Sequence, residues 1–600
     1  MMQHLKTKPE HDLLSILKKN KLFSSVYHEK IEKMALLFKE RMLAKGDFLF
    51  KQGESSLSLF LLADGKLSAS ITHDHQEEKI VGHIESGEMV GELGALSGEP
   101  RSLTVTAVKD CLLFELSNKD FIVLCHQHPD IMFSALRTIL ARSQKILYMI
   151  QNDKQTNHYI AIIPTNAQVP FKPFCEGIIK YTAKINSLII ISDFDDTWDE
   201  EKIRATEKNK KSSQRIIYLL QSLETPLAKL CLKKISVLYL VADGASEPHI
   251  ESNIIDYIQQ HVDYFLTPPA LVLLYPPNTN KPRHTARYFS DITFRLHHHL
   301  KMDVPMHYQR LIRFIRGTAV GVVLGGGGTR GFAHIGAIKA LREKKIPIDM
   351  IGGASVGAIV AGCYAMNESV EDTYHLFHHI VEAARGSISW KSITWPYISL
   401  FDAKKFTEAL QNTFDLLIED LWIPYFCVSS NIANDTEAVH QTGVLWEKMR
   451  ASAAVPGIIP PMILDGELHL DGGLLNNLPV DIMREFLGDK ARIIAIELNG
   501  SLEDKRKYIF PPILTLKETI LMKLHLRPNP YKFPRFIDNF LRGLMIGSSA
   551  KTRQNGLAAT LLINLTLNKF RLLHASMKQA EKLTEIGYHE TLSRLPDRSS

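Results

Sequence analysis

Two stretches of sequence decide the fold of the C-terminal half of the chain, AVGVVLGGGGTRG at 319–331 and IDMIGGASVG at 348–357. The first opens with a Val-rich run typical of a buried strand and ends in a run of glycines. Apolar residues at helical spacing follow from Phe332. The second is a short strand that ends in GASVG at 353–357, which is G-x-S-x-G between a strand and a helix. The pattern predicts a sharp turn with Ser355 at its tip.

The predicted turn would present Ser355 as a nucleophile suited to acyl transfer. Gly353 and Gly357 flank the serine because a strained strand-to-helix turn leaves no room for larger side chains. The turn places the Ser355 hydroxyl at a helix N-terminus, where the helix dipole favours developing negative charge. Acyl transfer also needs a base and hydrogen-bond donors for the oxyanion. The candidate donors are the backbone N–H groups of the glycine run at Gly326, Gly327 and Gly328.

The candidate base lies in HLDGGLLNNLP at 469–479. Asp471 ends an apolar stretch and precedes Gly472 and Gly473, which predicts a carboxylate at a strand tip in a tight turn. An unperturbed aspartate has a pKa of about 4 and is a poor base at neutral pH. The hypothesis therefore requires that Asp471 be desolvated and hydrogen-bonded directly to Ser355.

GGGGTRG, GASVG and DGG, in this order, resemble the motifs of the patatin-like phospholipase family, and ASAAVPGIIPP at 451–461 resembles a further stretch of it. The resemblance implies an α/β hydrolase domain with a Ser355–Asp471 dyad, no catalytic histidine and no required cofactor. It implies hydrolysis of phospholipid or lysophospholipid esters. Arg330 would steady the glycine loop or attract an anionic lipid head group. The other motif residues are Gly331, Gly353, Gly357, Gly472 and Gly473.

The glycine run also permits two other interpretations. Gly326-x-Gly328-x-x-Gly331 after a strand is the fingerprint of a dinucleotide site, which needs an acid at the end of the second strand. The nearest acid, Asp349, lies at the start of that strand, so the fingerprint is incomplete. Glycines required only for packing a strand–helix turn are the other alternative.

The N-terminal part has a different pattern. Short strands with glycine turns, from about Leu43 to Glu115, predict a small antiparallel barrel or jelly roll. GELGALSGEPRS at 91–102 resembles the phosphate-binding cassette of cyclic nucleotide-binding domains. A helix opening at Gly91 offers N–H groups to a phosphate, Arg101 can pair with that phosphate, and Glu92 can accept from a ribose hydroxyl. The candidate nucleotide-binding residues are Gly91, Glu92, Leu93, Arg101 and Ser102.

The predicted regulatory ligand of this barrel is cAMP or cGMP. The alternative is a retained fold that binds no nucleotide and only mediates contacts, because fold does not imply function.

The middle of the chain predicts an α/β layer with a parallel sheet, from apolar runs at 159–164, 187–192, 235–241 and 270–275. The D-x-D-x-T at 193–197 resembles a phosphotransferase motif, but no later lysine–acid set accompanies it, which favours an acid-rich loop capping a helix. The histidine run at 297–299 is interpreted as a surface cluster rather than a metal site, because no acids or cysteines lie at ligand spacing.

These segments together predict a multidomain chain similar to the neuropathy target esterase-like subgroup. Its parts are flanking N-terminal helices, a β-barrel or jelly-roll cyclic nucleotide-binding domain, an α/β middle domain and a C-terminal α/β patatin-like hydrolase domain. The predicted boundaries are 1–40, 41–152, 153–304 and 305–600. Residues 505–550 would form a lid or lipid contact, or helices packed on the catalytic core.

Composition sets limits on partners and location. The 600 residues carry a net charge of +6, and the basic runs are short, which indicates solvated loops rather than a nucleic-acid groove. The six cysteines lack metal-ligand spacing. We expect no signal peptide or membrane span, and a cytoplasmic protein with peripheral contact to a membrane surface. The oligomeric state stays open. The alternative function is a cyclic nucleotide-responsive interaction protein with a vestigial hydrolase domain.

Overall fold

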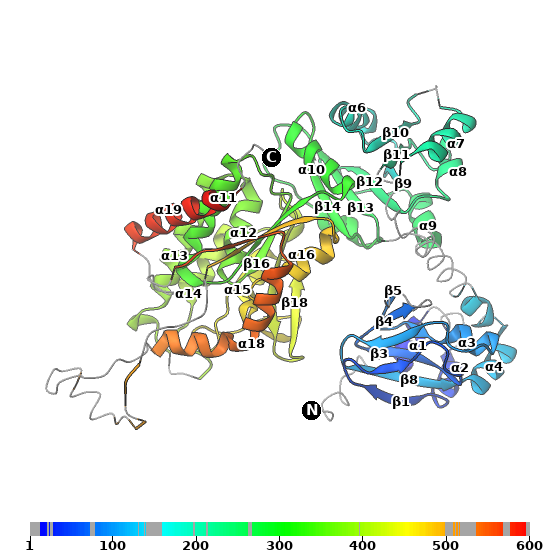
Figure 1. Ribbon diagram of the computed structural model, residues 1–600, viewed down its shortest axis with the longest axis horizontal. Helices are drawn as coiled ribbons and strands as arrows, with labels where there is room; N and C mark the ends of the chain where they lie inside the picture. Colours follow the sequence, from blue (N-terminus) through cyan, green and yellow to red (C-terminus); the bar gives the residue numbers. More distant parts are fainter. Residues whose placement is uncertain are drawn as a thin grey trace. The chain divides into compact units, whose positions relative to one another are not determined.

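In the computed structural model the chain forms two compact units, residues 1–156 with 260–266 and residues 157–259 with 267–600 (Figure 1). The structure describes residues 13–20, 23, 28–71, 79–129, 131–136, 139, 159–195, 198–211, 214–261, 267–394, 397–498, 508–510, 512–513, 515, 522, 536–567 and 576–595. The four domain boundaries expected from the sequence stay a prediction.

The first unit is a jelly roll of two antiparallel sheets, as predicted. Their strand orders are β1-β8-β3-β6 and β2-β7-β4-β5. The strands are β1 Lys39–Leu43, β2 Phe48–Phe50, β3 Ser58–Asp64, β4 Lys66–Ile71, β5 Lys79–Glu85, β6 Met89–Val90, β7 Thr104–Ala107 and β8 Cys111–Ser117. The helices are α1 Leu13–Lys19, α2 His28–Ala35, α3 Glu92–Ser97 and α4 Asn118–Gln127.

Strand β3 shows why this unit has two cores. Leu59 and Leu61 pack with the helices, whereas Phe60 and Leu62 pack with residues of the opposite sheet. Successive side chains of a strand point to opposite faces, so a strand buried on both faces reads as a continuous apolar run.

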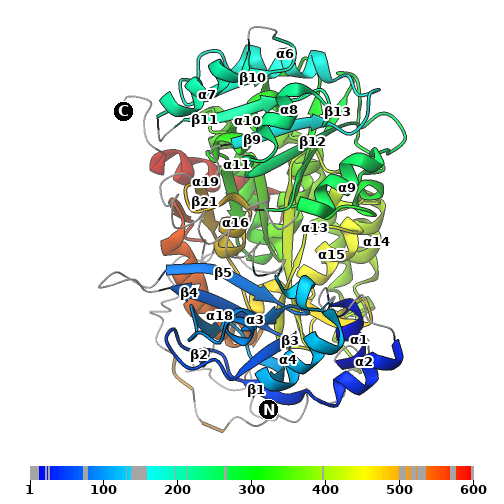
Figure 2. The ribbon, with the colours of Figure 1, turned by 90° about the vertical axis from the view of Figure 1, so that its right-hand side faces the viewer.

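The middle of the chain forms a six-stranded parallel sheet with the order β10-β11-β9-β12-β13-β14. Helices α6 and α10 contribute to the core on this sheet (Figure 2). The strands are β9 Tyr159–Pro164, β10 Leu188–Ser192, β11 Arg215–Leu219, β12 Val237–Asp243, β13 Ala270–Tyr275 and β14 Leu296–Lys301. The helices are α6 Phe171–Thr182, α7 Glu200–Asn209, α8 Pro226–Cys231, α9 Ser252–His261, the 3₁₀ helix η4 Thr285–Phe289 and α10 Pro305–Arg316.

Two of these strands, β11 and β14, were not expected from the sequence, and the surface prediction for the histidine run is wrong. The run lies on β14, and His298 and His299 are only 4% and 3% exposed. The His298 ring packs 4.5 Å from the ring of Phe314, and His299 packs 5.5 Å from Tyr275. Burial lowers the pKa of both imidazoles, and a neutral imidazole packs as a planar core side chain.

The C-terminal region is built on a larger mixed sheet with the order β19-β20-β17-β16-β15-β21-β22, and β18 pairs with β17. Its strands are β15 Val320–Leu324, β16 Met350–Ala354, β17 Tyr425–Asn431, β18 Thr436–His440, β19 Met462–Leu464, β20 Glu467–Asp471, β21 Arg492–Glu497 and β22 Leu561–Asn564. Its α-helices are α11 Phe332–Glu343, α12 Val356–Asn367, α13 Val370–Ser387, α14 Lys404–Thr413, α15 Leu445–Ser452, α16 Val480–Leu487, α18 Phe536–Ala558 and α19 Met577–Arg594. Its 3₁₀ helices are η5 Gly328–Gly331, η6 Trp390–Ser392, η7 Ile418–Asp420 and η8 Gly472–Leu474.

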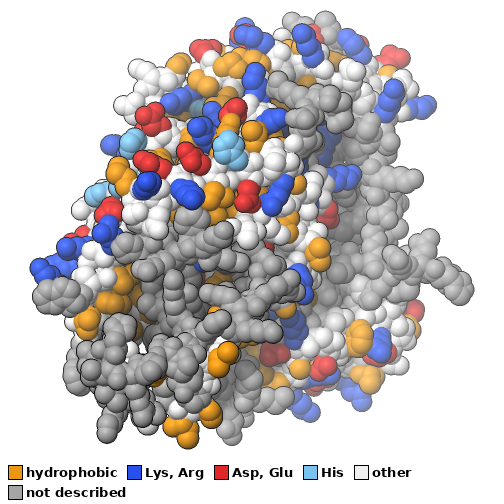
Figure 3. Space-filling model, turned by 60° about the vertical axis from the view of Figure 1, so that its left-hand side comes forward, with side chains coloured by type: hydrophobic (Ala, Val, Ile, Leu, Met, Phe, Trp, Pro, Cys, Tyr) orange, Lys and Arg blue, Asp and Glu red, His pale blue; other side chains and the backbone are white. Residues whose placement is uncertain are grey.

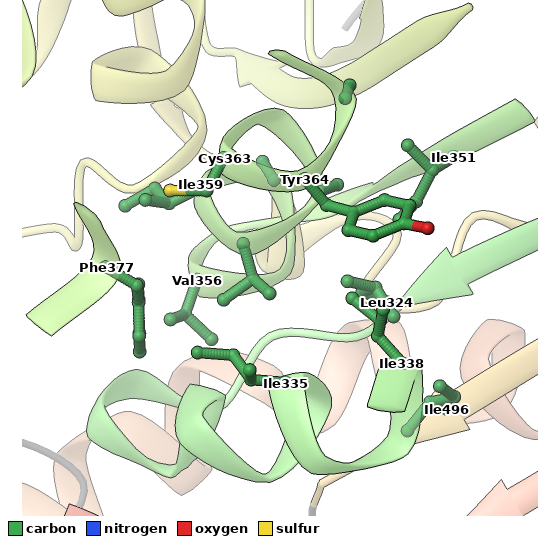
Figure 4. Close-up of a cluster of buried hydrophobic side chains, with 14 of the residues drawn as sticks. Leu324, Ile335, Ile338, Ile351, Val356, Ile359, Cys363, Tyr364, Phe377 and Ile496 are labelled. Atoms are coloured by element: carbon green, nitrogen blue, oxygen red, sulfur yellow. The ribbon is translucent and has the colours of Figure 1, made fainter. Parts of the chain in front are cut away.

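The core of this region forms where α11 and α12 meet the strands. Ile335 and Ile338 of α11 lie with Val356 and Ile359 of α12 over Leu324 of β15 (Figure 4). Helix α19 lies along α11 (Figure 1) so closely that a Cβ on Gly336 would be 1.9 Å from the Thr584 carbonyl oxygen. This packing holds β16, which ends at the serine turn, and α12, which begins there.

On one face of the molecule, basic and acidic side chains are interspersed (Figure 3). Within the residues that the structure describes, no helix is both long and apolar enough to cross a bilayer.

Of the segment at 505–550 expected to be a lid or a packed helix, residues 536–550 belong to α18, where the Ser548 hydroxyl donates to the Gly473 carbonyl oxygen at 2.7 Å. This part of the segment is therefore packed on the core.

Candidate active site

Ser355 lies in a strained turn between β16 and α12. Its φ and ψ angles are 54° and −125°, and it is the N-cap of α12. Such conformations cost about 1–3 kcal/mol and persist where the surroundings enforce them. The glycines of the turn lie against the end of β15, because a Cβ on Gly353 or Gly357 would be 2.2 or 2.1 Å from the Leu324 carbonyl oxygen. The turn can therefore be built only with glycine at both positions.

Asp471 ends β20 and faces Ser355. The Ser355 hydroxyl donates to Oδ2 of Asp471 at 2.6 Å, and the Gly473 N–H donates to Oδ1 at 2.8 Å. The backbone of Asp471 is fixed as well, because its N–H donates to the Ala454 carbonyl and its own carbonyl accepts from the Ser430 hydroxyl, both at 2.9 Å. A Cβ on the following Gly472 would be 2.2 Å from a backbone oxygen of β17, so the turn after Asp471 also needs glycine.

The electrostatics of Asp471 suit a base that works near neutral pH. Burial raises the pKa of Asp471 to about 6, against the lowering effect of hydrogen bonds from Ser355 and the Gly473 N–H. Among the described residues no histidine hydrogen-bonds to Ser355 or to the Asp471 carboxylate. His469, the nearest in sequence, bonds instead to the hydroxyl of Ser429 at 2.8 Å.

The glycine loop passes beside Ser355, and a Cβ on Gly326 would be 3.2 Å from that of Ser355. The Gly326 N–H donates to the Asn477 carbonyl oxygen at 3.3 Å. In the described part of the chain the N–H groups of Gly327 and Gly328 have no acceptor, so these two of the three candidate donors are free to bind an oxyanion. Arg330 and Gly331 follow in η5, where a Cβ on Gly331 would be 2.5 Å from a methyl carbon of Val356.

An apolar cavity of about 120 Å³ opens beside Ser355. Its side chains come mainly from α13 and the segment before β19, and include Phe377, Ile380, Val381, Phe406 and Ile458. Such a lining suits a hydrocarbon chain, because burying apolar surface is favourable while an unpaired polar group would be costly.

Sequence reasoning missed three side chains that support the site. The Ser452 hydroxyl accepts from the Ser355 N–H at 2.9 Å, and Ser548 holds the Gly473 carbonyl. His334 lies 2.8 Å from the Gly325 carbonyl oxygen. Ser452 belongs to the 451–461 stretch singled out by the family resemblance, whereas Ser548 and His334 carry no local signal.

Two of the alternative interpretations, the dinucleotide site and the phosphotransferase motif, lose support. Asp349 is fully buried and accepts from Arg313 at 2.6 and 2.8 Å and from the Val320 N–H at 2.9 Å, so it is not available to a ribose. Asp193, the first acid of the D-x-D-x-T stretch, accepts from the Gln221 N–H and the Thr225 hydroxyl at 2.8 and 2.9 Å. Residues 196–197 of that stretch lie outside the described residues.

In the jelly roll, the predicted nucleotide residues surround the start of α3. Gly91 has a φ of 93° as the N-cap of that helix. Arg101 is 6% exposed, and its guanidinium donates to the Ser58 and Gly91 carbonyl oxygens at 2.5 and 3.3 Å. Glu92 is buried, whereas Leu93 and Ser102 are exposed. The arginine is thus held beside the helix N-terminus that would receive a phosphate.

The six cysteines are buried free thiols. Within the described residues no group of three or more His, Cys, Asp or Glu side chains is arranged to hold a metal ion.

Comparison with known proteins places two family models on the chain. The model described as patatin-like phospholipase matches residues 322–484, and the model described as cyclic nucleotide-binding domain matches residues 40–128. Neuropathy target esterase sws of Drosophila melanogaster is 28% identical over 518 residues, which cover 77% of this chain and 36% of the fly protein. A patatin-like phospholipase domain-containing protein of Caenorhabditis elegans is 26% identical over 580 residues, 83% of this chain and 41% of its own length.

The chain therefore spans only about two fifths of the length of these curated relatives. Among solved structures, the regulatory domain of Toxoplasma gondii PKA with cAMP is 28% identical, with a TM-score of 0.19, over 20% of this chain and 46% of that one.

Proposed function

Because this chain carries a patatin-like phospholipase domain and a cyclic nucleotide-binding domain, we propose that it is a serine acyl hydrolase that releases fatty acids from phospholipids or lysophospholipids. The observation that carries the proposal is the 2.6 Å hydrogen bond from Ser355 to the buried carboxylate of Asp471. The apolar cavity beside Ser355 supports an acyl group as the part of the substrate that is bound.

In the proposed reaction, the Ser355 oxygen attacks the acyl carbonyl carbon and its proton passes to Oδ2 of Asp471. The oxyanion of the tetrahedral intermediate accepts from the N–H groups of Gly327 and Gly328. The carbon–oxygen bond to the alcohol then breaks, and Asp471 returns the proton to the leaving oxygen. Water then attacks the acyl carbon of the acyl-enzyme while Asp471 takes its proton. The bond from that carbon to the Ser355 oxygen breaks, Asp471 returns the proton to this oxygen, and fatty acid and free serine result. The reaction uses no metal or organic cofactor.

We propose a regulatory cyclic nucleotide at the start of α3, with Arg101 and the helix N–H groups on the phosphate and Glu92 on the ribose. The buried position of Arg101 beside Gly91 supports this site. We also propose a cytoplasmic protein that contacts the membrane peripherally, because its substrate resides there.

The test is fatty-acid release from a panel of phospholipids and lysophospholipids by wild type and Ser355→Ala, each with and without cAMP or cGMP. The matched control is Ser593→Ala, an exposed serine on α19. We expect release from wild type and the control and none from Ser355→Ala. A wild type that neither releases fatty acid nor reacts with a fluorophosphonate, yet is stabilised by cyclic nucleotide, would favour the interaction protein with a vestigial hydrolase domain.

A further inference from the structure

A buried histidine that takes no part in the proton transfer contacts the glycine loop. His334 lies in the first turn of α11, is fully buried, and its Nε2 is 2.8 Å from the Gly325 carbonyl oxygen. A carbonyl oxygen only accepts, so Nε2 carries the proton. Burial lowers the pKa of His334 to about 4, and the ring is therefore neutral in the range where Asp471 can act as a base. In this neutral form His334 donates to the loop.

The contact fixes the orientation of the first peptide unit of the glycine run. The Gly325 carbonyl accepts from His334, while the N–H of Gly326, on the same peptide plane, donates to the Asn477 carbonyl at 3.3 Å. The Gly325 N–H donates to the Ile496 carbonyl at 3.0 Å. A planar peptide held at both its oxygen and its nitrogen cannot rotate.

Beyond this peptide the loop continues with Gly327 and Gly328, whose N–H groups have no acceptor in the described part of the chain. Glycine is the most conformationally free residue, so a run of glycines has little intrinsic preference for one arrangement. The fixed peptide therefore anchors the start of the loop segment that carries these two N–H groups.

We propose that His334 is the positioning residue of the oxyanion hole. It aims the Gly327 and Gly328 N–H groups at the developing oxyanion by fixing the Gly325 carbonyl. The inference rests on the proposed acyl hydrolysis but assigns a role outside the Ser355–Asp471 pair. A displaced donor would reduce the stabilisation of the transition state more than that of the ground state, because the negative charge develops only during the reaction.

The chain offers a close control for a purely structural role. His299 is also buried, its Nε2 also lies 2.8 Å from a backbone carbonyl oxygen, that of Glu419, and its pKa is also lowered by burial. Its carbonyl partner lies in η7, outside the glycine loop. Replacing either histidine by leucine removes a comparable buried hydrogen bond. Only the replacement of His334 removes a hydrogen bond to the glycine loop.

The experiment compares wild type, His334→Leu, His334→Gln and His299→Leu on a soluble short-chain p-nitrophenyl ester. Glutamine can present an amide N–H near the position of Nε2, whereas leucine cannot. We expect His334→Leu to lower kcat by about 10- to 100-fold with KM nearly unchanged, since small misplacements of catalytic groups have effects of this size. We expect His334→Gln to restore most of kcat and His299→Leu to leave it unchanged.

Hydrogen–deuterium exchange of the peptide covering 322–331 provides a readout that needs no activity. We expect faster exchange in His334→Leu and exchange like wild type in His334→Gln and His299→Leu. Unchanged kcat in His334→Leu, or an equal loss in His334→Leu and His299→Leu, would overturn the inference. If wild type hydrolyses no ester, the proposed function fails. Independently of activity, unchanged exchange in His334→Leu would refute the inference that His334 orders the glycine loop.

Discussion

Nη2 of Arg310 lies 2.7 Å from Oε1 of Glu368, and the two side chains are only 5% and 10% exposed. Arg310 belongs to α10, and Glu368 directly follows α12, whose N-cap is Ser355. One turn further along α10, Arg313 pairs with Asp349, which directly precedes β16. Helix α10 therefore contacts the far ends of both elements that flank the serine, and so supports the candidate active site from the middle region.

The Glu368→Gln variant tests this support. It leaves the buried Arg310 charge without its counter-charge, and breaking a buried pair in this way typically costs about 3–5 kcal/mol. We expect a clear fall in the free energy of unfolding by urea titration. The matched control is Glu382→Gln, because Glu382 pairs with Arg385 at 3.4 Å in an exposed position, where such pairs contribute about 0–1 kcal/mol. Equal destabilisation by the two variants would contradict the prediction.

The Asp471→Asn variant should lose activity and gain stability. The folded state raises the pKa of Asp471 from 3.8 to about 6, so the ionised carboxylate is disfavoured by folding. The contribution of this group to stability is fully present below pH 4 or so and is lost as pH rises through about 6. Asparagine carries no charge and avoids this loss, which amounts to about 3 kcal/mol at most.

Thermal unfolding at two pH values checks whether Asp471→Asn gains stability over wild type as pH rises. We expect Asp471→Asn to exceed wild type in Tm at pH 8 and the difference to shrink at pH 4. Asp415→Asn, at an exposed position, should show neither effect. A variant less stable than wild type at pH 8 would mean that the Asp471 charge stabilises the fold.

The rate of hydrolysis should follow the ionisation of the same carboxylate. Only ionised Asp471 can accept the serine proton, so kcat/KM should rise with pH through an apparent pKa near 6 and then level off. The measurement is a pH–rate profile between pH 4.5 and 8 with an uncharged ester. A profile that is flat over this range, or whose midpoint lies above pH 7, would point to another base.

Filling the apolar cavity should change the preferred acyl length. Ala384 of α13 lines the cavity, and Ala384→Phe would occupy much of its 120 Å³. We expect kcat/KM for a dodecanoyl ester to fall by about 10-fold relative to that for a butanoyl ester, because differences of even one methylene in an apolar pocket reach this size. Ala433→Phe, at an exposed position after β17, should leave the ratio unchanged. Parallel loss for both esters in Ala384→Phe would contradict an acyl site here.

Sequence could predict the parts of the molecule in which the backbone conformation leaves room for only one residue type. Gly353 and Gly357 must be glycine because the Leu324 carbonyl occupies the space of a Cβ, and this demand is visible as a motif. The jelly roll was likewise visible in its short strands and glycine turns, and its prediction was confirmed.

The remaining features depend on contacts between distant segments. Ser548 reaches the Gly473 carbonyl across 75 residues of chain, and no local pattern records this. The histidines of β14 are a second example: the absence of acids and cysteines at ligand spacing argues against a metal site but does not reveal that His298 and His299 are buried. Phe314 and Tyr275 come from other elements and make the buried site suitable for a neutral imidazole.

Ser355 and Asp471 are separated by 116 residues, and they meet across a sheet in which β17 lies between β16 and β20. During translation, Ser355 is therefore synthesised long before Asp471. Until β20 has docked beside β17, the serine has no proton acceptor in this arrangement. Reactivity toward a fluorophosphonate should consequently appear late during translation, as a signature of completed assembly, and a nascent chain would leave nearby lipids intact.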